Sequence, residues 1–152
     1  MSTPNALPSE RVAVGGVIDP EAQGAATVTS DWLDMTNFQT GLAIVLVGEM
    51  AATSTVDAKI EQATDGSGTG AKDLSGSSIT QLTAAGSDDD KQVLVQFRSQ
   101  DLDITNDFTH ARLSVTVGTA ASDLAGVVLG MDARTAPASD NDLASVDEIV
   151  TA

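Results

Sequence analysis

The sequence contains no cysteine and no tyrosine, and aromatic residues make up only 3% of its 152 residues. Without cysteine it can form no disulfide, no thiolate nucleophile and no closed cysteine zinc site, and its single histidine excludes a multi-histidine metal site within one chain. With one Trp and three Phe, it also has few rings on which bases or sugars could stack. We therefore predict a non-enzymatic protein with no cofactor and no metal site.

Basic residues are also scarce. Seven Lys and Arg stand against 22 Asp and Glu, which gives a formal net charge of −15 and a sequence pI of about 4.1. Phosphate backbones and anionic lipid surfaces would be repelled, so we expect neither nucleic acid nor membrane as a partner. The charge is explained either by solubility or by attraction to a basic protein surface. No apolar run approaches the roughly 20 residues of a membrane helix, and residues 1–10 lack the features of a secretory signal, so we expect synthesis in the cytoplasm.

Motifs for catalysis or ion binding are weak. His110 is the only histidine, and no Gly-x-Ser-x-Gly turn is present to expose a nucleophilic serine. A pair of carboxylates for glycoside hydrolysis stays open, because distance in space decides that chemistry. The three consecutive acids Asp88, Asp89 and Asp90 lack the alternating ligand spacing of a calcium loop, which favours a solvated acidic loop.

A six-residue apolar run over residues 42–47, between Gly41 and Gly48, predicts a central strand buried on both faces. Trp32 and Phe38 are expected to pack against this strand, with a ligand platform as the alternative for Trp32. A strand at 93–98 is expected to pair with one at 111–117. Further strands are predicted by alternating or continuous apolar residues at 11–18, with a bulge at Gly15-Gly16, and at 56–62 and 124–131.

Seven or eight strands without helical crossovers predict an all-β fold, an antiparallel β-sandwich or jelly roll. We divide the chain into an extended N-terminal arm (1–10), a β-sandwich domain (11–136) and a C-terminal tail (137–152). The tail has apolar residues at intervals of three, which favour a short amphipathic docking helix. Apolar residues near the two ends are the candidate interaction residues: Leu7, Val12, Val14, Leu143, Val146 and Ile149.

Three segments, 56–66, 79–82 and 108–117, resemble small virion structural proteins of tailed bacteriophages, with likeness over roughly residues 40–134. The closest role in that group is a capsid decoration or cement protein. The resemblance implies a β-rich homo-oligomer on the virion exterior, bound to the major capsid protein as trimers near local threefold axes, with terminal arms reaching along the shell. No catalytic residue is implied.

Two alternatives stay open. Jelly rolls also serve as lectins, so a virion attachment or carbohydrate-binding module using Trp32 or His110 is the runner-up. A tail or head–tail joining subunit is the third possibility, and copy number per particle distinguishes it from a decoration protein.

Overall fold

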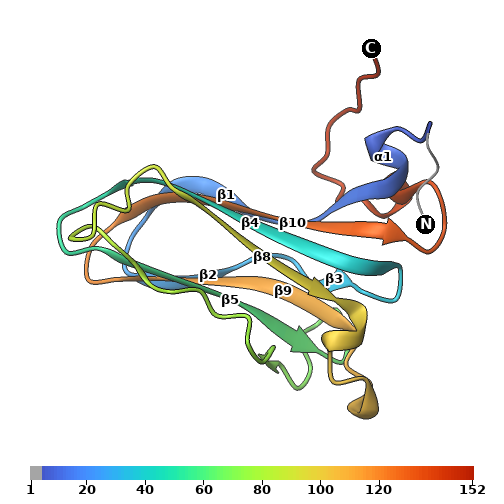
Figure 1. The fold of residues 1–152 in the computed structure, drawn as a ribbon, viewed down its shortest axis with the longest axis horizontal. Helices are drawn as coiled ribbons and strands as arrows, with labels where there is room; N and C mark the ends of the chain where they lie inside the picture. Colours follow the sequence, from blue (N-terminus) through green and yellow to red (C-terminus); the bar gives the residue numbers. More distant parts are fainter. Residues whose placement is uncertain (1–4) are drawn as a thin grey trace.

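The computed structural model describes residues 5–152, which form a two-layered β-sandwich (Figure 1). The long strands alternate apolar and polar residues, which directs one side chain in two toward the opposite sheet. The strands are β1 (Val12–Gln23), β2 (Ala26–Thr29), β3 (Leu33–Asp34), β4 (Phe38–Met50), β5 (Thr55–Ala63), β6 (Lys72–Asp73), β7 (Leu82–Thr83), β8 (Gln92–Arg98), β9 (His110–Gly118) and β10 (Ser122–Ala133). The helical turns are α1 (Pro8–Arg11), η1 (Ser99–Asp101), η2 (Ile104–Asn106) and η3 (Ala138–Asn141).

The strands form two antiparallel sheets. Sheet A has the order β1-β10-β4-β8, and sheet B has the order β2-β9-β5-β6, with β3 added to β9 and β7 to β5. From β4 to β10 the successive long strands alternate between the two sheets, and β10 returns to lie beside β1. This order is a jelly roll, so the predicted fold class is confirmed.

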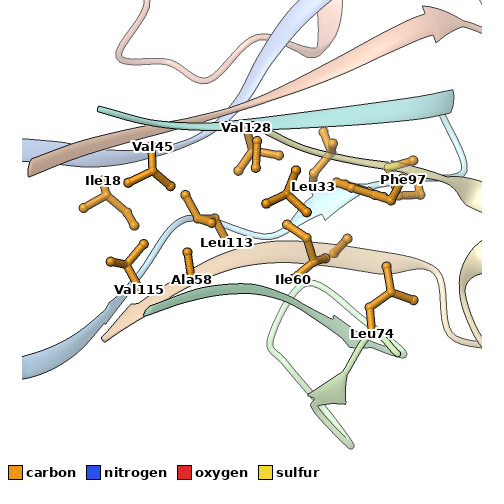
Figure 2. Packing of buried hydrophobic residues seen from close by; sticks show 14 of the residues in the cluster. Ile18, Leu33, Val45, Ala58, Ile60, Leu74, Phe97, Leu113, Val115 and Val128 are labelled. Carbon is orange, nitrogen blue, oxygen red and sulfur yellow. The ribbon is translucent and has the colours of Figure 1, made fainter. Parts of the chain in front are cut away.

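The core lies between the two sheets and consists of aliphatic residues with three Phe and two Met (Figure 2). Sheet A contributes Val45 and Val128, and sheet B contributes Ile60, Leu113 and Val115 from the opposite side, all of them fully buried. Branched aliphatic side chains therefore fill most of the core, in which aromatic residues are few.

Glycines let two aromatic rings approach the backbone of sheet A closely. A Cβ on Gly130 would approach the ring of Phe38 to 2.6 Å, and one on Gly41 would overlap the ring of Phe97. The predicted bulge in β1 is also present, since the register with β10 shifts between Val14 and Gly16. The rings of Phe38 and Phe97 therefore fill the space that side chains at Gly130 and Gly41 would occupy.

The predicted pairing of the strands at 93–98 and 111–117 is wrong. β8 pairs with β4 in sheet A, whereas β9 pairs with β5 in sheet B. The chain between them passes through η1 and η2 and crosses from one sheet to the other (Figure 1). Similar alternation in two successive strands does not by itself indicate that they are neighbours.

The expectation that residues 42–47 are buried on both faces is also wrong. Ala43, Val45 and Val47 point into the core, but Leu46 on the other face is 48% exposed. A two-layered sandwich has only one interior, so a strand in it is covered on one face only. Trp32 does not pack against this strand either, because its indole stacks on Arg112 of sheet B; Phe38 is buried as expected.

The two ends of the described chain lie at one end of the sandwich (Figure 1). α1 and η3 contact each other, and both contact β1. The predicted arm contains the turn α1 rather than being extended throughout, and its residues 1–4 lie outside the described residues. The predicted tail helix over 143–149 is not formed, because this segment has no helical hydrogen-bond pattern beyond η3.

Candidate assembly surfaces

The outer face of sheet A is apolar and largely uncovered. Leu46 is 48% exposed and Leu94 is 62% exposed, and their apolar neighbours on this face are half-buried. We call this surface the apolar face. Its members are Val12, Val14, Val17, Leu42, Ile44, Leu46, Leu94, Ala125, Val127, Leu129 and Met131.

The register of the strands makes this face continuous. Val127 of β10 lies opposite both Val17 of β1 and Ile44 of β4, and Ile44 lies opposite Leu94 of β8. Three strand spacings of about 4.8 Å and six residue rises of about 3.4 Å give a patch of about 14 by 20 Å. The largest apolar patch of a monomeric protein is commonly about 300–600 Å² and often functional, so this face is a candidate interaction site.

The outer face of sheet B is polar and contrasts with the apolar face. Lys59 pairs with Asp73 at 2.8 Å, and the Arg112 Nε donates to Glu61 Oε1 at 2.9 Å. The Asp73 carboxylate raises the pKa of Lys59 by hydrogen bonding to its ammonium group. The two sides of the sandwich therefore differ in kind: sheet B presents paired charges to solvent and sheet A presents hydrocarbon.

Trp32 and His110 both lie near the loop between β5 and β6. The guanidinium of Arg112 stacks 4.4 Å from the centre of the Trp32 ring, and the indole edge packs against the backbone of Gly68. The His110 Nδ1 is 2.8 Å from the hydroxyl of Thr109. The indole is thus partly covered by its own chain, which leaves less of it as a platform for a sugar.

The candidate residues from the two ends separate into two groups. Val12 and Val14 belong to the apolar face, and Leu143 lies beside them because its backbone N–H donates to Val14 O at 2.9 Å. The Asp142 Oδ1 accepts the N–H of Val14 at 2.7 Å, so residues 142–143 cap the free edge of β1. Val146 continues this segment through a turn onto the carbonyl oxygen of Leu143.

Leu7 and Ile149 lie farther from the strands and point into solvent. Leu7 is 45% exposed in front of α1, and Ile149 is 51% exposed with its neighbour Val150 at 78%. The structure therefore places Val12, Val14 and Leu143 at the β1 border of the apolar face. Val146 follows Leu143 through a turn, and Leu7 and Ile149 are exposed near the ends of the described chain.

A pocket of about 610 Å³ opens at the end of the sandwich near η1 and η2. Its apolar lining comes from Met35, Leu102, Ile104 and Phe108, and Arg98 and Arg134 also line it. We call it the arginine pocket. A neighbouring hollow of about 440 Å³ shares Thr40 and Arg98 with it and extends along Leu42 and Met131 on the apolar face.

The carboxyl groups with perturbed pKa values lie in loops and do not form a catalytic group. Hydrogen bonding to Thr69 lowers the pKa of Asp65, and the lysine partners Lys91 and Lys72 lower the pKa values of Asp88 and Asp103. Within residues 5–152 no three His, Cys, Asp or Glu side chains come together as a metal site. The same part of the chain has no helix of the length and hydropathy needed to cross a bilayer.

Sequence reasoning missed the outer residues of β4, β8 and β10 as an interaction surface. The signal was present, because the apolar runs at 42–47 and 124–131 were predicted without any helix that could cover their outer side. In a sandwich, every second residue of such a run must face away from the core.

No protein-family model matches the chain, and no curated protein matches its sequence. Among solved structures, it is similar to a chain of Broad Bean Stain Virus, at 12% identity over 90% of this chain and 93% of that chain, with a TM-score of 0.45. It is also similar to a chain of the infectious bursal disease virus Gt strain, at 16% identity over 85% of this chain and 34% of that chain, with a TM-score of 0.45. A chain of the Gx strain matches at 14% identity over 84% of this chain and 34% of that chain, with a TM-score of 0.38. The chain spans about a third of the length of these last two, and the likeness is one of β-rich architecture.

Proposed function

We propose that the protein is a non-enzymatic structural subunit of a virion, and specifically a decoration or cement protein that binds the outside of a major capsid lattice. The observation that supports this most is the apolar face, a continuous hydrocarbon surface in a chain of net charge −15. Leaving such a surface in water is unfavourable, so it is best explained as a docking surface for another protein.

The size of the apolar face fits a repeated contact better than an isolated one. Its flat area of roughly 300 Å² is well below the roughly 800 Å² per partner of a stable two-protein interface. A lattice that presents many equivalent sites, with subunits linked to one another, gains affinity through effective concentration. In this arrangement sheet A faces the shell and the charged outer face of sheet B faces solvent.

The test is the amount and position of the chain in particles. Particles purified from the source of this sequence should contain it in stoichiometric proportion to the major shell protein, as measured by quantitative mass spectrometry. Labelling with a membrane-impermeant amine reagent should modify Lys59 of intact particles, since it lies on the outer face of sheet B. Absence from particles, or a few copies per particle, would reject the decoration role; a few copies would favour a joining subunit.

The carbohydrate-binding alternative makes a separate prediction. It needs Trp32 or His110 to contact a sugar, and the structure places both near the β5–β6 loop. Because the Arg112 guanidinium stacks on one face of the indole, replacement of Trp32 should lower the free energy of unfolding whether or not a sugar binds. A glycan array bound by the wild-type chain but not by Trp32→Ala of equal stability would favour this alternative.

A further inference from the structure

The arginine pocket contains two of the few cations that lack a close carboxylate partner. Of the seven basic residues, all three lysines and Arg112 pair with carboxylates at 2.6 to 2.9 Å. The Arg98 Nε reaches Asp101 only at 3.8 Å, and its side chain is 65% exposed. The Arg134 Nη2 contacts Ser99 Oγ at 3.1 Å and Phe38 O at 3.4 Å, which are uncharged acceptors.

The floor of the pocket is apolar, and part of it is open to solvent. Ile104 is 64% exposed, next to the buried side chains of Leu102 and Phe108. A pocket that has two arginines beside an apolar floor is suited to bind a peptide segment with carboxylates followed by aliphatic side chains. A neutral or basic segment would bring no carboxylate to these guanidinium groups.

The described chain contains such a segment at residues 147–150, with the sequence Asp-Glu-Ile-Val. All four residues are exposed, and in residues 5–152 no hydrogen bond joins this segment to the rest of the protein. Ile149 and Val150 are among the most exposed large apolar side chains, at 51% and 78%. The segment is therefore free to bind elsewhere.

The Arg98 side of its own pocket is at the limit of reach. The segment leaves from Leu143 and Val146 beside β1; Arg134 follows β10, the neighbour of β1, but Arg98 lies on β8, three strand spacings or about 14 Å across sheet A. Four residues after Val146 span at most about 14 Å when fully extended. Binding within one chain would leave the segment stretched straight across the sheet, but the pocket of a second copy has no such restriction.

We propose that residues 147–150 of one copy bind in the arginine pocket of a second copy of this chain. Asp147 and Glu148 pair with Arg98 and Arg134, and Ile149 and Val150 cover Ile104. Because donor and acceptor surfaces differ, the contact is heterologous and closes into a ring or continues as a chain of subunits. It goes beyond the proposed virion role and does not depend on it, since the purified protein alone would associate.

Sedimentation velocity of the full chain at increasing concentration tests this contact. The wild type should associate, and Arg98→Glu or Glu148→Lys should each weaken association about tenfold, because attraction becomes repulsion. The double variant Arg98→Glu/Glu148→Lys has the wild-type net charge and should restore association. Asp89→Lys makes the same charge change as Glu148→Lys at an exposed acid in another loop, and should leave association intact.

Two further measurements make the outcome decisive. Circular dichroism should show the same β spectrum for every variant, and Ile149→Ser should weaken association without changing charge. A wild type that stays monomeric at all concentrations, including one whose segment binds its own pocket, would overturn the proposal. Association that neither single charge reversal weakens would also overturn it.

Discussion

Replacing Leu46 and Leu94 together by Gln tests whether the apolar face is the docking surface. These two leucines are the most exposed members of that face, at 48% and 62%. Full burial of a leucine side chain contributes about 1.5–3 kcal/mol, so burial of the exposed parts of both contributes roughly 2–3 kcal/mol on docking. The double variant should therefore bind about 30- to 150-fold more weakly at each contact.

The folded chain itself should change little. Both side chains already face water, so we expect the free energy of unfolding to fall by about 1 kcal/mol or less. The assay uses particles stripped of the protein and re-supplied with each variant, and the bound fraction is measured after sedimentation. Urea unfolding followed by Trp32 fluorescence gives the stability of each variant in parallel.

Val45→Ala is the matched control on the inner face of the same strand. Val45 is fully buried, so this change should cost about 2 kcal/mol of folding stability while the folded molecules bind as the wild type does. The reasoning is refuted if the leucine double variant binds normally, or if Val45→Ala weakens binding as much as the leucine changes do.

Three further outcomes follow from the geometry. Gly41→Ala should lower the free energy of unfolding in urea by about 1–3 kcal/mol because its methyl overlaps the Phe97 ring, and Phe97→Leu in the same chain should recover part of that loss; strict additivity would contradict this. Asp142→Ala removes the acceptor 2.7 Å from the Val14 amide, so hydrogen exchange at that amide should accelerate; unchanged protection would show that the edge is held otherwise. The hydrogen bond from the Lys72 ammonium lowers the pKa of Asp103 in the folded state. The ionised carboxylate therefore stabilises the folded protein above the unfolded-state pKa, and this stabilisation is lost as pH falls through the folded-state pKa. The decline in the urea midpoint below about pH 4 should become shallower in Asp103→Asn.

The strands and the fold class were predictable because side-chain alternation is a local property. Residues 56–62 and 111–117 alternate cleanly, and both are strands with the expected inward faces. The neighbours of each strand were not predictable in the same way. The register that joins β8 to β4 depends on contacts across about fifty residues of chain, which no local pattern reports.

The candidate site was predicted only at its border. Val12, Val14 and Leu143 were selected because they lie near the chain ends, and they lie at the β1 side of the apolar face. The spacing of Leu143, Val146 and Ile149 suggested a helix, but a segment this short has little helical stability alone, and its backbone instead bonds to the edge of β1. Its apolar residues are thus spread along an irregular segment that contains a turn, rather than gathered on one side.

The contrast between the two sheets gives a reason for the strong acidity of the chain. Free copies with an uncovered hydrocarbon sheet would tend to stack sheet against sheet and precipitate. With a formal charge of −15 on each copy, long-range repulsion opposes such collisions at moderate ionic strength. The carboxylates then act as a colloidal stabiliser that opposes non-specific stacking of uncovered sheets, while the contact proposed at the arginine pocket brings opposite charges together at short range.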